Sequence, residues 1–416
     1  MEYYHRAIGV LLLLILMIIV YYHFYTLNDG VNRTFMISPH TPSIGTTERS
    51  SSGNHLLKTK TNVKRILFYT SFFNHRPWFI FPENPSSINY SKRYGCNFDS
   101  CHISYNRSDF NRSDLVVFHP RDINVMKDEE YERINMRRLN SLRPKNQLWL
   151  FFILENPFGH RNVKMFDRYF NVTTSYRLNS DIRLPYRYHQ RINTITAHNR
   201  VNHDYNYKHN YAEGKTKQMV WAVSHCNCLR DQLAMKLHEH GLNIETFGRC
   251  RFNFTKHRHD RRIPYAEYKF VFAAENHLCD DYITEKYWVH GLAEKVNTIP
   301  IVFGGANYSD PRLAIPGSYI DAMKFESPKK LAEYLLAVDH NDTLFNSYFD
   351  WRKYWMLSDG GHPDHPHRYS RWLCDVCDTL HADRWTFPRK PLLSRIDVYK
   401  ECLGHEQYFR KWINIE

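Results

Sequence analysis

The sequence predicts an α/β protein with two Rossmann-like domains facing a cleft, preceded by a transmembrane helix and a flexible stem. Three observations lead to this fold class. Short, continuous apolar runs, typical of strands buried on both faces, recur between residues 62 and 359. In residues 208–359 these runs alternate with helical segments, which is the pattern of a parallel sheet. The amino terminus is apolar over about the 20 residues that a membrane-spanning helix needs.

The amino-terminal segment predicts a signal anchor. Residues 7–25 are apolar and aromatic, and no small-residue cleavage site follows them. Arg6 precedes this run and the next basic residue is Arg33, so the positive-inside rule keeps residues 1–6 in the cytosol and the rest in a lumen or outside the cell. A cleaved signal peptide is the alternative. Residues 26–61 are rich in Ser, Thr, Asn, Gly and Pro, which predicts a flexible stem.

Several features agree with a lumenal location. The nine cysteines form local groups, which in an oxidising compartment more often make disulfides than metal sites, and the odd number leaves one thiol free or paired between chains. Triplets of the type Asn-x-Ser/Thr offer N-glycosylation at Asn32, Asn89, Asn106, Asn111, Asn171, Asn253, Asn307 and Asn341. The net charge is +13, but the basic residues are spread along the chain, so nucleic acid is not an expected partner.

Residues 62–207 are expected to form the first Rossmann-like domain. Its strand-like runs are Arg65–Tyr69, Asp114–His119 and Gln147–Ile153. Between the second and third runs, Met126–Leu142 has helical spacing and ends before a proline.

Residues 208–359 are expected to form the second domain. The polar, lysine-rich stretch Tyr207–Gln218 is interpreted as the interdomain linker. Strands and helices then alternate, and Gly241 stands where a helix C-cap is expected. The predicted strands are Met219–Val223, Ile244–Phe247, Lys269–Ala274 and Ile299–Phe303, and the predicted helices are Arg230–His240 and Ile283–Glu294.

The segment 270–305 carries the most informative chemistry. A buried strand leads to Asn276, and a helix is expected to begin near Asp281 with Glu285 and Lys286 in its first turn. Ligands of parallel sheets bind beyond the carboxyl ends of the strands, and the free N–H groups of a helix amino terminus attract anions. Lys286 adds a cation there, which favours a diphosphate, while Glu285 suits hydrogen bonds to sugar hydroxyls. The alternative is that Asp281 only caps the helix and its first turn is merely solvated.

The same segment closely resembles the donor-binding signature of the α1,3-fucosyltransferase family. Several long matches in the same order are far more specific than one short motif. They are Glu275-Asn276, Asp281–Lys286 (Asp-Tyr-Ile-Thr-Glu-Lys), Ile299–Gly304, Trp221–Cys226 with Arg230, Phe247–Cys250, and the block Tyr176–Tyr186. Cysteines that sit where family members hold disulfides are Cys96, Cys101, Cys374 and Cys377, and the further disulfide candidates are Cys226 and Cys250.

The resemblance implies a Golgi type II glycosyltransferase of the GT-B type, with GDP-fucose as donor and a glycoprotein N-glycan as acceptor. It implies an acceptor-binding domain (62–207), a GDP-fucose-binding domain (208–359) and a tail (360–416) that packs back on the first domain. The implied donor contacts are Tyr176, Ser224, Arg230, Asn276, Tyr282, Glu285 and Lys286. Of these, Arg230 and Lys286 would neutralise the diphosphate as the glycosidic bond breaks. Family members often carry Asn where this chain has His225, so a side-chain contact there would differ.

Glu155 is the candidate catalytic base. It ends the apolar run Leu148–Leu154 and is followed by Asn156, where the family pattern has serine. Inverting sugar transfer needs one base to take the proton of the acceptor hydroxyl, and a carboxylate at the mouth of a partly buried cleft suits that task. The expected reaction is transfer of fucose to O3 of an N-acetylglucosamine.

Metal is not expected to be required, although it could stimulate. The chain has no Asp-x-Asp motif, the usual acidic clamp for a metal-bound sugar nucleotide. Cys374, Cys377 and His381 could be drawn as a zinc site, but a lumenal location favours disulfides. Two other functions stay open: an inactive glycan-binding or scaffold relative, and a transferase for another sugar nucleotide. The positions of Cys226 and Cys250 resemble those of family members that fucosylate the core GlcNAc, and this resemblance favours the core GlcNAc as acceptor; antennal LacNAc or LacdiNAc also stay open.

Overall fold

The computed structural model describes residues 63–80, 101–123, 134–157, 168–192, 209–258, 262–293, 296–358, 368–382 and 399–415. The chain divides into two compact units, residues 1–59 and 60–416, and all of the described residues belong to the second unit. The predicted anchor (7–25) and stem (26–61) therefore lie outside the described residues. Within the described ranges, none of the helices combines the length and the apolarity needed to cross a membrane.

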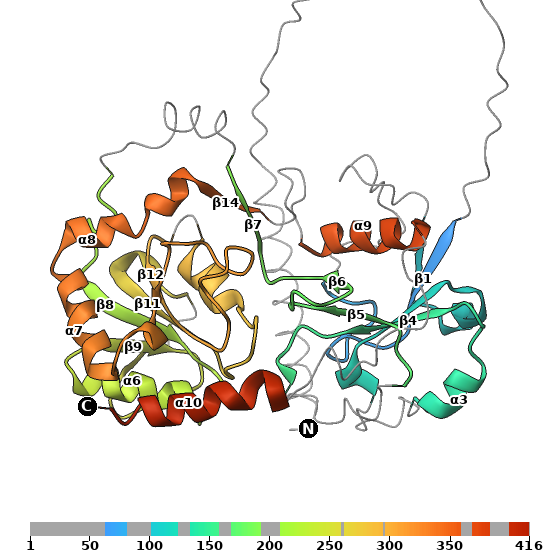
Figure 1. The fold of residues 1–416 in the computed structure, drawn as a ribbon, viewed down its shortest axis with the longest axis horizontal. Helices are drawn as coiled ribbons and strands as arrows, with labels where there is room; N and C mark the ends of the chain where they lie inside the picture. Colours follow the sequence, from blue (N-terminus) through green and yellow to red (C-terminus); the bar gives the residue numbers. More distant parts are fainter. Residues whose placement is uncertain are drawn as a thin grey trace, which may run out of the picture. The chain divides into compact units, whose positions relative to one another are not determined.

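The first half contains a parallel, six-stranded sheet of order β2-β1-β3-β4-β5-β6 (Figure 1). Its strands are β1 (Lys64–Phe68), β2 (Cys101–Ser104), β3 (Leu115–Phe118), β4 (Leu148–Phe152), β5 (Val172–Ser175) and β6 (Ile182–Arg183). The three predicted runs are confirmed as β1, β3 and β4, and every residue of β3 and β4 is buried. Short helices connect the strands: η3 (Arg107–Arg112), η4 (Pro120–Ile123) and α3 (Met136–Ser141). Helix α3 is the end of the predicted helix Met126–Leu142, whose earlier part lies outside the described residues.

The second half contains another parallel, six-stranded sheet, of order β10-β9-β8-β11-β12-β13. Its strands are β8 (Lys217–Ala222), β9 (Ile244–Phe247), β10 (Lys256–Arg258), β11 (Tyr268–Ala274), β12 (Ile299–Phe303) and β13 (Ile320–Asp321). Its helices are α6 (Leu229–Glu239), η6 (Tyr265–Glu267), η7 (Lys286–Gly291), η8 (Ala322–Lys324), α7 (Pro328–Asp339), α8 (Asp342–Ser347) and η9 (Asp350–Lys353). As predicted, α6 is followed by Gly241, which has a φ of +98°. The α/β fold class with two Rossmann-like sheets is thus confirmed.

The predicted linker reaches too far. Its last residues belong to β8, where Lys217 forms an ion pair with Glu267 at 2.6 Å. Lys215 Nζ donates to the carbonyl of Tyr268 at 2.9 Å. The end of the predicted linker is therefore bound to η6 through Lys217 and to β11 through Lys215.

The helix predicted over Ile283–Glu294 is wrong in kind and in length. The structure forms only η7, a π-helical turn of 6 residues. In a π-helix the hydrogen bonds span five residues, as between Leu292 N and Tyr287 O at 3.1 Å. The wider turn places Tyr287, Trp288 and Leu292 in one buried cluster. A helix this short offers little dipole, so the expected anion attraction at its amino terminus must come from side chains instead.

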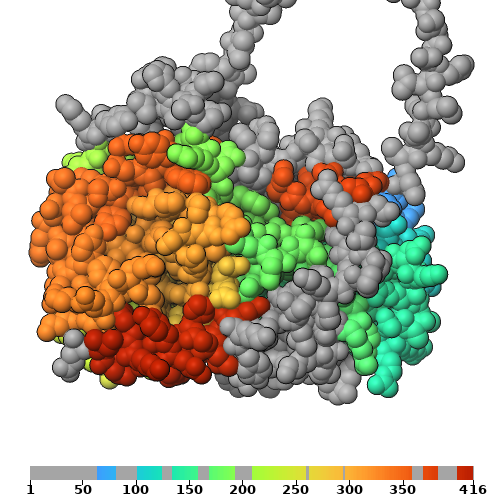
Figure 2. All heavy atoms as spheres, viewed as in Figure 1, coloured from blue at the N-terminus to red at the C-terminus, as the bar shows by residue number. Residues whose placement is uncertain are grey.

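The carboxyl-terminal residues divide between the two sheets. Helix α9 (Arg368–His381) packs on the first sheet, where Trp372 Nε1 donates to Thr174 Oγ1 at 3.0 Å. In contrast, α10 (Gly404–Trp412), which follows η11 (Tyr399–Leu403), packs on the second sheet through Phe409 and Trp412. Figure 2 shows the red surface of this last segment against the orange and yellow surface of the second half. Of the segment 360–416, which was expected to pack on the first domain, α9 thus contacts the first sheet and α10 the second.

A two-stranded antiparallel ribbon also joins segments from both halves. It pairs β7 (Tyr188–Arg191) with β14 (Trp355–Ser358). The ribbon therefore pairs the part of the chain that follows β6 with the part that follows η9.

Candidate active site

A cavity of about 610 Å³ opens at the carboxyl ends of β8, β9 and β11. This is where ligands of parallel α/β sheets bind, and the volume is typical of small-molecule sites. We call it the donor cavity. Its lining consists of Ala222, Val223, Ser224, His225, Arg230, Phe247, Gly248, His257, Arg258, Ile263, Asn276, Glu285, Lys286 and His290. The predicted residues Ser224, Arg230, Asn276, Glu285 and Lys286 are thus brought together.

Lys286 is held at the cavity by a fully buried carboxylate. Its Nζ lies 3.1 Å from Glu275 Oε2 and donates to Thr284 Oγ1 at 2.7 Å. Glu275 also accepts hydrogen bonds from the backbone N of Thr284 at 2.7 Å and from its Oγ1 at 2.9 Å. Burial acts to lower the pKa of Lys286, but the carboxylates of Glu275 and Glu285 outweigh it and raise that pKa. Lys286 is therefore a fixed cation in the cavity wall.

Arg230 is the second cation, and part of its guanidinium is used structurally. The side chain is buried, with Nη1 donating to Ala274 O and Nη2 to His225 O, both at 2.9 Å. Its Nε is buried and has no hydrogen-bond partner among the described residues. Two of the five N–H groups of the fork thus bind the end of β11 and the loop after β8, and others are left for a ligand. Because the contact to His225 is made through the backbone, the change from the family's asparagine leaves it intact.

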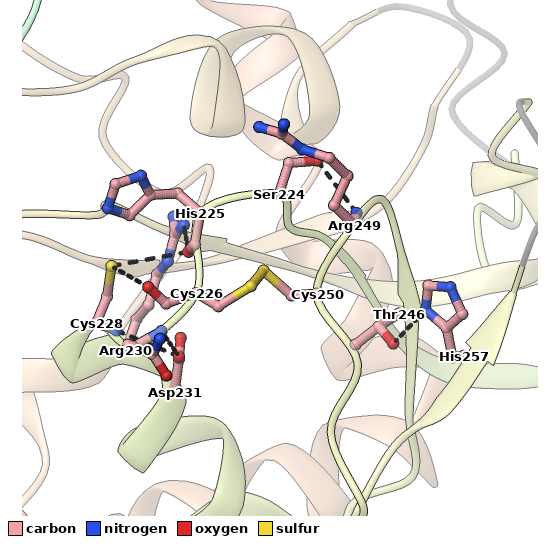
Figure 3. The surroundings of a disulfide bond; sticks show 11 residues. Ser224, His225, Cys226, Cys228, Arg230, Asp231, Thr246, Arg249, Cys250 and His257 are labelled. Carbon is pink, nitrogen blue, oxygen red and sulfur yellow. Dashed lines mark hydrogen bonds between the residues drawn. A yellow bond between two sulfur atoms is a disulfide. The ribbon is translucent and has the colours of Figure 1, made fainter.

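A disulfide joins the two loops that form one wall of the cavity. Cys226, after β8, is bonded to Cys250, after β9 (Figure 3). Beside it, Ser224 Oγ accepts a hydrogen bond from the backbone N of Arg249 at 3.3 Å (Figure 3). Gly248 has a φ of +111°, and a Cβ there would collide with Val223 O and lie 2.8 Å from Ser224 Oγ. Only glycine therefore allows the loops to approach this closely.

Two predicted donor contacts, Tyr176 and Tyr282, lie outside the lining of this cavity. They pack against each other with ring centroids 5.0 Å apart, in a buried cluster with Cys279 and Cys402. Burial, and then the carboxylate of Glu155, raise the pKa of Tyr282 well above its ordinary value, so its phenol stays a hydrogen-bond donor.

The predicted base, Glu155, contacts the second half through this tyrosine. It is half-buried, three residues beyond β4, and its Oε2 accepts a hydrogen bond from Tyr282 OH at 3.5 Å. The next residue, Asn156, donates from Nδ2 to Asn276 Oδ1 at 3.5 Å. Glu155 is not part of the lining of the donor cavity, but its neighbour Asn156 contacts Asn276, which is.

Sequence reasoning missed several residues of the site. His257 and Arg258 on β10 and His290 in η7 line the cavity, but nothing in their spacing marked them. Glu275 belongs to the matched pair Glu275-Asn276 but is assigned no role from the sequence; a carboxylate directly after a buried strand and before a lysine-bearing turn was the available signal. Asp281 does not cap η7: its φ is +58°, and its Oδ2 accepts from Leu178 N at 3.1 Å.

The disulfides link distant parts of the chain. Cys101 is bonded to Cys377 and Cys279 to Cys402, the second pair not having been predicted. Cys374 is also disulfide-bonded, while Cys96 lies outside the described residues. In this oxidised state neither Cys374 nor Cys377 offers a thiolate, so the zinc alternative with His381 does not fit. Among the described cysteines, Cys228 is free.

The candidate glycosylation sites differ in accessibility. Asn32 and Asn89 lie outside the described residues, whereas Asn106, Asn111, Asn253, Asn307 and Asn341 are exposed. Asn171 is half-buried, and its Oδ1 accepts hydrogen bonds from Arg143 Nη2 and from Trp149 N. A glycan there has the least room.

Two parallel α/β sheets, a cationic cavity at the strand ends and a carboxylate beside it define the class of protein: a glycosyltransferase. Two sequence models of one family match the chain, described as "Fucosyltransferase, N-terminal" over residues 61–187 and "Glycosyltransferase family 10 (fucosyltransferase) C-term" over residues 212–393. The chain belongs to glycosyltransferase family 10, the fucosyltransferases.

Individual relatives agree with this family. The chain is 32% identical to glycoprotein 3-alpha-L-fucosyltransferase A of Drosophila melanogaster, over 80% of its own length and 59% of that protein. It is 31% identical to alpha-(1,3)-fucosyltransferase C of the same organism, over 77% of this chain and 74% of that protein. A 3-galactosyl-N-acetylglucosaminide 4-alpha-L-fucosyltransferase of Bos taurus is 32% identical over 61% of this chain. The chain thus spans 59% and 64% of the length of the first and third of these relatives.

One solved structure, an alpha1,3-fucosyltransferase with GDP-fucose, aligns with a TM-score of 0.42 and 16% identity, covering 72% of this chain and 85% of that chain.

Proposed function

We propose that the protein transfers fucose from GDP-fucose to O3 of an N-acetylglucosamine in an N-glycan, with inversion at the anomeric carbon. Membership of family 10 supports the reaction class. The observation that carries the proposal is that the segment of Glu155 contacts the second half next to the donor cavity. Asn156 contacts Asn276, which lines that cavity, and Glu155 accepts a hydrogen bond from Tyr282. A site for sugar transfer needs these two parts side by side, a holder for the nucleotide diphosphate and a base for the acceptor.

The diphosphate would lie between Lys286 and Arg230 in the donor cavity. As the bond between fucose and GDP breaks, negative charge builds up on the leaving phosphate oxygens. Cations that are already fixed in place stabilise this charge without reorganisation. Lys286 is fixed by Glu275 and Thr284, and Arg230 by two backbone carbonyls.

Glu155 would act as the base. It takes the proton of the acceptor hydroxyl while that oxygen attacks the anomeric carbon from the face opposite to GDP, which inverts the configuration. The neutral phenol of Tyr282 holds one carboxylate oxygen, so the other is left for the acceptor proton.

The acceptor and the location follow from the same proposal. The name of the first relative describes action on glycoproteins, and the Cys226–Cys250 disulfide is the feature that favours the core GlcNAc over antennal acceptors. The predicted anchor, the exposed glycosylation triplets and the disulfides support a type II protein of the Golgi membrane with its catalytic part in the lumen. Divalent metal is proposed to be dispensable, since Lys286 and Arg230 supply positive charge at the donor cavity.

A GDP-release assay tests the proposal. The full chain, purified in detergent, is incubated with GDP-fucose and either a core glycopeptide or a free antennal disaccharide, with and without EDTA. Release that depends on one acceptor and resists EDTA is expected. Release with GDP-mannose but not with GDP-fucose would replace the donor, and GDP binding without turnover on either acceptor would favour an inactive glycan-binding relative.

A further inference from the structure

A second cavity adjoins the donor cavity and has no part in the reaction proposed above. Its volume is about 580 Å³, close to that of the donor cavity, and His225 and Asn276 line both. The remaining walls come from α6, the loop after Cys250, and α10. We call it the side cavity.

One wall of the side cavity is apolar. It contains Met235, whose exposed fraction is 40%, together with Phe252 and Phe254, whose ring centroids are 5.4 Å apart. Phe252 stacks on the buried Trp221 at 5.0 Å, so this wall is anchored in the core. A rigid aromatic wall with a few polar groups opposite is the usual make-up of a site for a small organic ligand.

Another part of the lining, which also includes α6, carries polar groups that the fold does not fully use. Asp231 accepts through Oδ2 from Asn227 N at 2.7 Å, but its buried Oδ1 has no partner among the described residues. Gln232 on α6 and Arg410 on α10 also line this cavity, and their side chains form no hydrogen bond or ion pair with the residues that the structure describes. Glu406 Oε1, 3.3 Å from His277 Nδ1, adds another acceptor. This part of the lining therefore offers both donors and acceptors to a ligand.

We propose that the side cavity binds the sugars of the acceptor glycan that lie beyond the fucosylated residue, which rests on the function proposed above. A saccharide presents hydroxyls that both donate and accept, and C–H faces that pack on aromatic rings, so it matches both parts of the lining. The carboxylates of Asp231 and Glu406 oppose a second phosphate-bearing ligand.

The position of the side cavity fits this occupant. Glu155 is followed by Asn156, which contacts Asn276, and Asn276 is a wall of the side cavity. A glycan whose reacting sugar lies at Glu155 can therefore continue past Asn276 into the side cavity. A single sugar or disaccharide held at Glu155 does not need it.

The test fills the side cavity with a larger side chain. Met235→Trp, on the exposed face of α6, is expected to raise KM for a complete N-glycan glycopeptide about tenfold, as the loss of one or two hydrogen bonds would. KM for a short acceptor, a peptide that carries the fucosylated N-acetylglucosamine without the sugars beyond it, and KM for GDP-fucose should stay within about twofold. Arg410→Ala should act in the same direction. Met235→Leu and Lys411→Ala, whose side chain is on α10 but outside the lining, are the matched controls.

Equal KM values for the glycopeptide in Met235→Trp and the wild type would overturn the proposal, as would a loss shared by both acceptors. If the effect appears with the glycopeptide but not with its released glycan, the side cavity binds peptide instead. Saturation-transfer NMR of the full chain in detergent with the released glycan measures binding without turnover. Loss of this signal in Met235→Trp supports the side cavity even if fucosyl transfer is not detected, so failure of the two proposals is distinguishable.

Discussion

Variants of the ion pair between Lys286 and Glu275 can separate the effect on GDP binding from the effect on the free energy of unfolding. In Lys286→Met, the Glu275 carboxylate, with a side chain that is 0% exposed, loses its ammonium partner. Removing one partner of a buried ion pair typically costs about 3–5 kcal/mol, because the other charge is left unpaired. We therefore expect a loss of about this size in the free energy of unfolding, measured by chemical denaturation. Loss of a charge-assisted hydrogen bond should also weaken GDP binding about tenfold to a hundredfold.

The double variant Glu275→Gln with Lys286→Met distinguishes the two effects. Glutamine can still accept the hydrogen bond of Thr284 N through its oxygen, can donate from its NH2 group to Thr284 Oγ1, and carries no charge. Most of the lost stability should therefore return, to within about 2 kcal/mol of the wild type. GDP affinity, measured by calorimetry, should not return, because the cation is still missing. Wild-type stability of Lys286→Met alone would refute the dependence of Glu275 on Lys286. Wild-type GDP affinity of either Lys286 variant would refute the donor contact.

Three further predictions concern the base, a histidine and a glycine. Glu155→Gln should lower kcat by about a hundredfold to ten-thousandfold with GDP affinity nearly unchanged, and unchanged turnover would remove Glu155 as the base. Burial lowers the pKa of His290 in the folded protein, so its imidazole binds a proton more tightly in the unfolded chain. The contribution of His290 to the free energy of unfolding is therefore complete above its ordinary pKa. It is lost as the pH falls toward the lower pKa of the folded protein. His290→Gln should therefore flatten this acid-side loss in denaturation curves recorded between pH 7 and pH 5, and an unaltered pH profile would contradict the assignment. Gly248→Ala should weaken GDP binding by displacing the loop at Ser224, whereas Gly317→Ala, also at positive φ but with no atom within 4 Å of the added Cβ, serves as the control and should bind GDP normally.

Local patterns in the sequence were enough to predict β1, β3 and β4 of the first sheet and β8, β9, β11 and β12 of the second, but not the remaining strands. The strands β3, β4 and β12 are continuous apolar runs because parallel strands are covered on both faces, so each run reports its own burial. The same holds for α6 and its closing Gly241, whose positive φ is a local requirement. The positions of Ser224, Arg230 and Lys286 near one another followed from a general rule, since the carboxyl ends of parallel strands meet at one edge.

What depends on distant residues was decided only by the tertiary structure. The bond between Cys101 and Cys377 spans a sequence separation of 276, and no local pattern specifies such a pairing. The π-helical turn η7 replaced the expected α-helix because Tyr287 and Trp288 bury against segments that are remote in sequence. Likewise, Glu155 meets Tyr282 only because the two halves pack at that point. The spacing of apolar residues in the sequence indicates which residues of a strand or helix are buried. Which residues far apart in the sequence contact each other is determined by how the two sheets and the carboxyl-terminal helices pack together.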